Sequence, residues 1–172
     1  MKIIMILDQI QSGMGTKDDA FLPLGGKRVA IGPAVMMEQA LAEVDGQILA
    51  CLYCGTSYFL KDPKTVSHKF CAMIEKLHPD VVVCGPAYDY KDYAYMSAYV
   101  AKAVSDLHIP VMAAMSQENG KVLAQYKDSI PIVITPAKGE GGLQRSLYNI
   151  CQLARQMVDG KVEETFRKKI CF

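Results

Sequence analysis

Five short apolar runs separated by amphipathic segments constrain the fold of this chain more than any other feature of its sequence. The runs are rich in Val, Ile and Leu and lack strict polar alternation, which is typical of strands buried on both faces of a parallel sheet. Parallel strands need crossover connections, so the intervening segments are expected to be helices. The predicted strands are Lys2–Leu7, Gln47–Cys54, Val81–Cys84, Pro110–Met115 and Ile130–Ile134.

Between these runs, hydrophobic residues recur at helical spacing. Asp62 and Pro63 predict a helix start with an N-cap and a proline at the first helical position. A shorter helix is expected from Gly32-Pro33. The sequence therefore predicts a single α/β domain, Rossmann-like or flavodoxin-like, with a doubly wound, mostly parallel five-stranded sheet and helices on both faces. The apolar positions of the three longer helices are Val66, Phe70, Ile74 and Leu77, then Met96, Val100, Val104 and Leu107, then Leu143, Leu147, Ile150, Ala154 and Met157.

The 172 residues suffice for one domain and are few for two. We assign residues 1–160 to the α/β domain. Residues 161–172 read as a charged C-terminal tail on the surface or against a partner. Within Gln117–Asp128, the pair Asn119-Gly120 suggests a small hairpin.

Charge and apolar patterning exclude several classes of protein. Nineteen basic and eighteen acidic residues give a net charge of +1, without the basic excess of a general nucleic-acid or anionic-membrane binder. No apolar run approaches the roughly 20 residues needed to span a bilayer. Ile3–Leu7 is also shorter than the core of a signal peptide. We expect a cytoplasmic protein with neither nucleic acid nor membrane among its partners.

The segment Asp8–Ile31 breaks the pattern, because it has no clear periodicity and contains four glycines and one proline. Loops beyond about 12–15 residues are uncommon in compact domains and are often functional. This one follows the first predicted strand and therefore leaves the sheet at its carboxyl edge, where open α/β sheets bind ligands. We expect the loop to contribute to a ligand site.

Cys51 and Cys54 form a C-x-x-C spacing, compatible with redox chemistry or with half of a zinc site. A reactive thiolate favours a helix N-terminus, whereas Cys51 lies inside a predicted strand, on which residues three apart point to opposite faces. No second pair follows to complete a zinc site, so no metal ligand is predicted. Cys54 ends its strand at the ligand edge and is the only candidate nucleophile, although a buried structural thiol is the favoured interpretation.

Three glycine-containing segments lie where a backbone could approach an anion. Gly32-Pro33-Ala34 opens a predicted helix, Gly85-Pro86-Ala87 follows a strand, and Lys138–Gly142 precedes the last helix. For the two Gly-Pro-Ala segments, helix initiation and turn formation are equally good interpretations. Gly13 and Gly15 complete neither nucleotide-binding fingerprint.

Tyr88 and Asp89 follow the third predicted strand, where they could hydrogen-bond a small polar substrate. His68, His78 and His108 lie in or near the ends of helices, away from that edge, and are poor catalytic candidates. No Ser-His-Asp or Cys-His triad can be assembled from strand-end residues. The residues alone therefore predict a fold and a ligand edge, but no reaction.

The order of these pieces resembles the N-terminal half of the selenoprotein B subunit of the glycine/sarcosine/betaine reductase family, with the D-proline reductase selenoprotein subunit as a relative. The resemblance covers about residues 1–160. Its most specific motifs are Cys54-Gly55-x-x-Tyr58-Phe59 and Gly85-Pro86-Ala87. Its other landmarks are Gln9, Gly13, Gly15, Ile31-Gly32-Pro33, Ala50–Cys54, Pro79-Asp80-Val81, Ile109-Pro110-Val111 and Glu118-Asn119.

This resemblance implies reductive cleavage of a carbon–nitrogen bond. In that family a pyruvoyl subunit holds the amino acid as a Schiff base, and the selenocysteine of the B subunit attacks the α-carbon and expels the amine. That selenocysteine lies in a second, C-terminal half, which is missing from this sequence. Gly15–Asp18 also replaces an acidic Gly-Gly-Glu stretch and Lys91–Tyr93 an Arg-Tyr-Gly pattern, so glycine, betaine and other amines stay open as substrates.

We therefore expect a subunit, or separately encoded half, of a reductase-like complex: an oxidoreductase component that is not active alone. It would shape the substrate pocket or dock partners, in a homo- or hetero-oligomer. The resemblance puts the pyruvoyl group and the selenocysteine on partner subunits and no cofactor in this chain. Besides Cys54 as the candidate nucleophile, the predicted ligand-binding residues are Asp8, Gln9, Gly13, Gly15, Gly32, Cys54, Gly55, Thr56, Tyr58, Gly85, Pro86, Tyr88, Asp89 and Glu118.

Two other interpretations fit the same residues. A flavodoxin-like module could hold a flavin phosphate or another small anion at the loop edge. A non-catalytic assembly protein could use its long loop and tail as an interface. The apolar composition of the chain fits a homo-oligomer of this kind.

Overall fold

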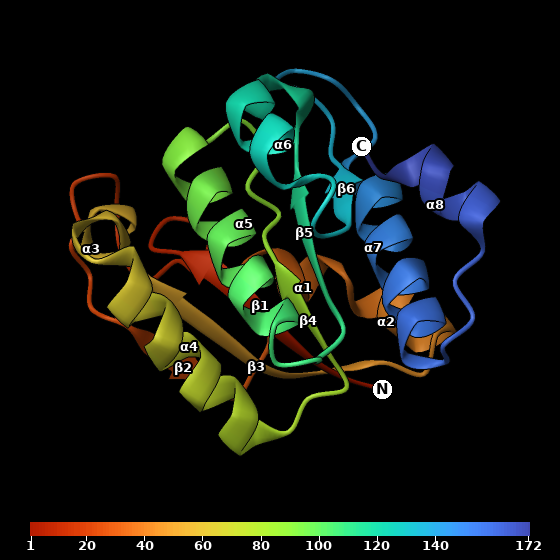
Figure 1. The fold of residues 1–172 in the computed structure, drawn as a ribbon, viewed down its shortest axis with the longest axis horizontal. Helices are drawn as coiled ribbons and strands as arrows, with labels where there is room; N and C mark the ends of the chain where they lie inside the picture. The colour runs from red at the N-terminus through yellow and green to blue at the C-terminus, as the bar shows by residue number, and fades with distance from the viewer.

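A computed structural model describes residues 1–172 and shows a six-stranded sheet covered by helices on both faces (Figure 1). The strands lie in the order β2-β3-β1-β4-β5-β6, and every neighbouring pair is parallel except β2 with β3. This confirms the α/β class and the mostly parallel sheet. The strands are β1 (Lys2–Asp8), β2 (Gly25–Lys27), β3 (Gln47–Cys54), β4 (Val81–Cys84), β5 (Val111–Met115) and β6 (Ile132–Ile134).

The five parallel strands follow the flavodoxin-like order, in which the chain starts at β1, steps outward to β3, and then returns past β1 to β4, β5 and β6. The direction of winding therefore reverses between β1 and β4. In open α/β sheets, ligands bind outside the carboxyl ends of the strands at such a reversal. The loops after β1 and β4 are the ones placed there.

The predicted count of five strands is wrong, because a short strand inside the long first loop adds a sixth. Gly25, Gly26 and Lys27 pair antiparallel with Tyr53, Leu52 and Cys51 of β3. Two glycines have low strand propensity, so this segment carries no local signal. At Gly25 an added Cβ would lie 2.8 Å from the Tyr53 ring, so the residue's small size allows the strand to pack against that side chain.

The helices divide between the two faces. On one face lie α3, α4, α5 and α6, whose apolar residues pack with Ile4 and Ile6 of β1. On the other lie α1, α2, α7 and α8, packed with Ile3, Met5 and Leu7. In Figure 1, α4, α5 and α6 cross the sheet on the same side. The helices are α1 (Pro33–Met36), α2 (Glu38–Glu43), α3 (Thr56–Lys61), α4 (Pro63–Leu77), α5 (Lys91–Ser105), α6 (Gly120–Tyr126), α7 (Leu143–Val158) and α8 (Glu164–Ile170).

Local signals set several of these boundaries as predicted. The Asp62 side chain accepts a hydrogen bond from the Thr65 amide at 3.1 Å and caps α4, with Pro63 in the first turn. The helix expected after Gly32 divides at Met37 into the two short helices α1 and α2. None of the helices has both the length and the apolar composition that crossing a membrane requires.

The hairpin predicted around Asn119-Gly120 is wrong. The segment forms a 3₁₀ turn, Gln117–Asn119, followed directly by α6. Gly120 has a helical φ of −48°, and the Asn119 side chain donates to the carbonyl oxygens of Tyr88 and Ser116. These hydrogen bonds hold the Asn119 side chain, and the segment does not form the hairpin turn that an Asn-Gly pair favours.

The tail after Gly160 is a packed part of the domain. It contains α8, whose Ile170 is buried in the same layer as α7. Cys171 then bridges to Val133 of β6 in an antiparallel arrangement, and the Phe172 amide donates to the Ile132 carbonyl at 3.1 Å. The sequence did not predict this helix, because α8 is only two turns long and most of its residues are charged.

Candidate functional site

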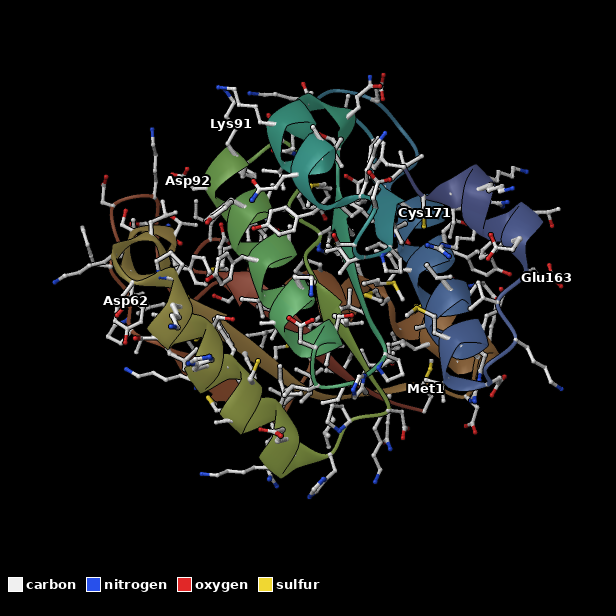
Figure 2. The ribbon with its side chains drawn as sticks, viewed as in Figure 1. Met1, Asp62, Lys91, Asp92, Glu163 and Cys171 are labelled. Carbon is white, nitrogen blue, oxygen red and sulfur yellow. The ribbon has the colours of Figure 1, made fainter.

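The candidate site is the edge of the sheet where β1, β3, β4 and β5 end, opposite the edge at which Met1 leads into β1. Figure 2 marks two residues near this edge, Lys91 and Asp92, in the first turn of α5. The loops that follow the four strands meet here. The structure brings most of the predicted residues into two hydrogen-bonded groups within these loops.

Asp8 ends β1 and is almost fully buried. Its Oδ1 accepts a hydrogen bond from the Gln11 amide at 2.6 Å. Burial raises the pKa of this carboxyl above its ordinary value, while backbone hydrogen bonds, with Gln11 first, pull the pKa down. Gly32 passes this turn so closely that an added Cβ would lie 1.8 Å from the Gln11 carbonyl oxygen, and its φ is +54°. Asp8 and Gly32 thus shape the turn that follows β1.

Gln9 fastens the long loop to the start of α3. Its side-chain Oε1 accepts from the Thr56 amide at 3.1 Å. The amides of Gly55 and Tyr58 donate to Leu22 and Ala20 carbonyls at 2.8 and 2.9 Å. At Gly55 an added Cβ would lie 2.1 Å from the Ala20 oxygen. Three amides that a ligand could have used at this helix start are therefore already paired within the chain.

Gly13 and Gly15 lie on the outer part of the same loop. Gly13 is exposed with a φ of +69° and open space around it. The Gly15 amide donates back to the Gln9 carbonyl at 3.0 Å. Beyond it, the amide and hydroxyl of Thr16 both donate to Asp19, which lowers the pKa of the exposed Asp19 carboxyl.

The second group joins the ends of β4 and β5. The Gly85–Pro86 peptide is cis, and at Gly85, with a φ of +118°, an added Cβ would lie 2.7 Å from the Ala114 carbonyl oxygen. Tyr88, also at positive φ, presents its carbonyl to the Ser116 amide and hydroxyl at 3.0 and 3.2 Å. Glu118 accepts from the same hydroxyl at 3.1 Å.

In this second group, burial raises the pKa of the Tyr88 phenol. Asp89, the next residue, is partly exposed beside it. The loops after β4 and β5 are therefore locked to each other by main-chain and side-chain hydrogen bonds. Tyr88 contributes to that lock through its carbonyl group.

Cys54 ends β3 at the predicted edge, but its thiol is fully buried. Its Sγ lies 3.5 Å from the Met96 sulfur. Burial first, and then the negative charge of Asp8, raise the pKa of Cys54 to about 12. A thiol held in its neutral form is a poor nucleophile, so this geometry supports the structural interpretation of Cys54.

The remaining cysteines are no better prepared for reaction. Cys51 lies in the opposite apolar layer from Cys54, as the strand spacing predicts, so the C-x-x-C pair is not a dithiol site. Burial raises the pKa of Cys51, Cys71 and Cys84, that of Cys151 to about 12, and that of Cys171 to about 11. No group of three or more His, Cys, Asp or Glu side chains is placed to hold a metal ion.

Three residues that build this edge are absent from the ligand-binding set that the sequence predicts. The fully buried Tyr93 hydroxyl donates to the Ile6 carbonyl of β1 at 2.9 Å and ties α5 to the central strand. Ser12 and Asn119 are buried polar residues that hold the turns after β1 and β5. For Ser12 and Asn119 the signal in the sequence is a polar residue in the loop or turn that follows a strand, whereas no local signal marks Tyr93, which lies inside α5.

A cavity of about 330 Å³ lies further along the same edge, beyond the end of β6. It is lined by residues of the loop after β6, by the first turns of α7 and by the end of α8. None of the predicted site residues lines it. Lys138–Gly142, which the sequence singled out as an anion loop, contributes three of its residues.

The flavodoxin-like order and the loops at its reversal point define a class of α/β domains that present a ligand or partner edge at the carboxyl ends of their strands. The family model of glycine/sarcosine/betaine reductase selenoprotein B matches residues 1–169, and the chain belongs to this family.

Two relatives illustrate the relationship. The chain is 27% identical to the sarcosine reductase complex component B subunit beta of Peptoclostridium acidaminophilum, over 94% of this chain and 37% of that protein. It is 32% identical to the glycine reductase complex component B subunit gamma of Symbiobacterium thermophilum, over 95% of this chain and 38% of that protein. The chain thus spans little more than a third of the length of these relatives. No solved structure matches it significantly.

Proposed function

We propose that this chain is a domain-sized component of a reductase complex that cleaves the carbon–nitrogen bond of a small amino acid or amine. The observation that carries the proposal is the family match, which extends over residues 1–169 and therefore over the whole α/β domain. The relatives are named as components of sarcosine and glycine reductase complexes, which supports this class of substrate.

The thiols of the chain support a part in the reaction other than that of the nucleophile. Each of the six cysteines has a pKa raised by burial, and Cys54, at the proposed edge, reaches about 12. No thiol here fits the role of the selenol nucleophile. These thiols support a role in which the selenocysteine and the pyruvoyl group lie outside residues 1–172, while this domain shapes the substrate pocket or docks partners.

The proposed docking edge, formed by the loops after β1, β3 and β4, is held rigid by hydrogen bonds. Gln9, the Gly55 amide and the Tyr88 carbonyl fix the loops after β1, β3 and β4 to one another or to β5. A rigid loop surface lets a partner subunit or a substrate bind without a large ordering cost. The exposed side chains of Met14 and Tyr90 are available on these loops for such contacts.

The test is an anaerobic affinity purification of the tagged full chain from its native host, followed by mass spectrometry. Recovery of a pyruvoyl-containing subunit and a selenol- or thiol-bearing subunit is expected. The recovered complex should release amine from glycine, sarcosine or betaine in the presence of a dithiol reductant. Recovery of the chain alone, or with neither of these two kinds of subunit, would overturn the proposal; a recovered complex that is inactive on all three compounds would exclude them as substrates.

A matched pair of variants can map the docking edge. Met14→Glu puts a charge on the proposed surface, where it should reduce co-purification of the partner subunits. Leu60→Glu changes an exposed apolar residue on the last turn of α3 and serves as the control. If both variants recover the partners as well as the unchanged chain does, the loop after β1 is not the docking surface.

The flavin interpretation draws support from the flavodoxin-like strand order alone. The loop after β1 uses its amides internally: those of Ser12, Gly13 and Gly15 donate to the carbonyls of Asp8, Ile10 and Gln9. These donors are not free for a flavin phosphate. A colourless protein after purification would count against this alternative, and a bound flavin spectrum would favour it over the reductase component.

A further inference from the structure

The cavity beyond β6 is lined mainly by three segments that are distant from the Asp8 and Cys54 region in the sheet order, and Gln117 of the turn after β5 completes the lining. Thr135–Ala137 follow β6, Gly141 and Gly142 lead into α7, and Lys169 and Ile170 end α8. Its volume of about 330 Å³ lies at the lower end of the range of small-molecule sites. In Figure 1, β6, α7 and α8 lie together at one side of the molecule.

The first turn of α7 supplies unpaired donors to this cavity. The helix runs for 16 residues, and its N-cap, Gly142, has no side chain with which to cap it. The first amide to pair is that of Ser146, which donates to the Gly142 carbonyl. The preceding amides of residues 143–145 have no acceptor in the chain. Such donors, together with the helix dipole, favour an anion.

The charged residues around the cavity add to this preference. Arg145 and Lys169 line it, and neither forms an ion pair with a carboxylate. The Arg145 guanidinium lies 5.8 Å from the centre of the Tyr148 ring. The one acidic lining residue is Glu140, whose Oε2 accepts from the Ala137 amide at 3.0 Å.

An observation independent of the helix points to a missing ligand. Thr135 lines the cavity and is only 2% exposed, yet its hydroxyl has no hydrogen-bond partner. Side chains alternate along a strand, so Thr135 faces the same side as Val133, toward α7. The Oδ1 atom of Asn149 on α7 is also buried and unpaired. Buried polar atoms are normally satisfied, so two unpaired ones beside one cavity need an explanation.

We propose that this cavity binds the phosphate group of a small phosphate ester. The free amides, Arg145 and the Thr135 hydroxyl donate hydrogen bonds to the phosphate oxygens. Asn149 Oδ1 is an acceptor, which the hydroxyl of a monoprotonated phosphate can satisfy and an ionised carboxylate cannot. The volume exceeds that of a bare phosphate and leaves room for a short organic group.

The test is isothermal titration calorimetry of the full chain with three probes: inorganic phosphate, glycerol phosphate and acetate. Glycerol phosphate is expected to bind most tightly, with phosphate weaker and acetate weakest. Arg145→Gln should weaken the binding of glycerol phosphate about tenfold, and Thr135→Val about fivefold. Lys161→Gln, an exposed residue beyond the opposite end of α7, is the matched control and should leave binding unchanged.

Thermal unfolding of each variant checks that the fold is kept. Thr135→Val should unfold at no lower temperature than the unchanged chain, since it removes an unpaired buried hydroxyl. Tighter binding of inorganic phosphate than of the ester would identify free phosphate as the source. Equal binding of acetate, no binding of either phosphate probe, or binding that neither variant weakens would overturn the proposal.

Discussion

Two parts of the same sheet edge satisfy their polar groups in opposite ways. At the end of β1, the Asp8 carboxylate, the Gln9 amide group and the start of α3 are paired with one another or with the long loop. At the end of β6, the first amides of α7, the Thr135 hydroxyl and the Asn149 oxygen have no partner. In the first region the folded chain supplies the hydrogen-bond partners itself. In the second region we expect a bound ligand to supply them.

This difference separates residues that build a surface from residues that bind a small ligand. A polar group already paired within the chain gains little from a ligand, because one hydrogen bond only replaces another. An unpaired buried group gains the full benefit of its first partner. The predicted residues at β1 and β3 thus define a shape for a partner, whereas the β6 corner offers chemistry for a small anion.

The largest expected loss of stability is at Gly55, where the loop after β1 packs against the start of α3. The Gly55→Ala change puts a Cβ about 2.1 Å from the Ala20 oxygen, so the loop must move away from α3. We expect a loss of about 3 kcal/mol in the free energy of unfolding, measured by urea denaturation. Gly120→Ala is the matched control, because its Cβ meets open space; that change should be neutral or stabilising by about 0.5 kcal/mol. A Gly55 variant as stable as the control would show that the loop is not fastened there.

A smaller loss is expected at Gln9. The Gln9→Met change keeps the shape of the side chain but removes the acceptor of the Thr56 amide. The unpaired amide should cost about 1–2 kcal/mol, and amide exchange should quicken at Thr56 before it does in β1. Hydrogen-exchange NMR measures the exchange rates of the Thr56 amide and of the β1 amides, and urea denaturation measures the loss in the free energy of unfolding. Unchanged protection of Thr56 would mean that the loop does not depend on this side chain.

A gain in stability is expected at the other corner. Thr135→Val replaces an unpaired buried hydroxyl with a methyl group of similar shape and should raise the free energy of unfolding by about 1 kcal/mol in phosphate-free buffer. Adding glycerol phosphate should narrow the difference, because only the unchanged protein binds it tightly. A loss of stability in phosphate-free buffer would show that the hydroxyl is satisfied within the fold.

The pH dependence of stability tests whether burial raises the pKa of Asp8. Its pKa is raised by burial from an ordinary value of 3.8, so the folded protein holds this proton more tightly than the unfolded chain does. The stability from Asp8 is therefore full in acid and is lost as the pH rises through the raised value. Asp8→Asn should gain stability relative to the unchanged protein between acid and neutral pH. A difference that stays flat with pH would contradict a raised pKa for the buried Asp8 carboxyl.

The strands were predictable because their apolar runs are long enough to determine one structure. Gln47–Cys54 and Val81–Cys84 form strands with the bounds that the runs indicate. The sheet position of Gly25–Lys27 was not predictable, since the packing of Tyr53 and the open edge of β3 decide it. The helix α8 was not predictable either, because Ile170 is its one buried residue and Phe166 is only partly buried against the same layer.

The candidate site was predictable in its place but not in its chemistry. Strand ends and glycines showed where the chain would turn, and the loops after β1, β3, β4 and β5 meet there. Whether an amide at a helix start is free depends on residues far away, as Ala20 and Leu22 show at α3. The hydroxyl of Thr135 is unpaired for the same reason: no tertiary neighbour supplies a partner, and no sequence pattern reports that.

The two outer strands of the sheet also limit how the protein can assemble. At one side β2 pairs antiparallel with Cys51–Tyr53, and at the other residues 171–172 bond to Ile132 and Val133. Each short segment occupies main-chain groups that would otherwise act as a template for a foreign strand. The first half of β3, Gln47–Ala50, and the outer edge of the three-residue strand β2 are left without such a neighbour. We therefore expect other subunits to attach through helices and loops, so that the complex can come apart without unzipping a shared sheet.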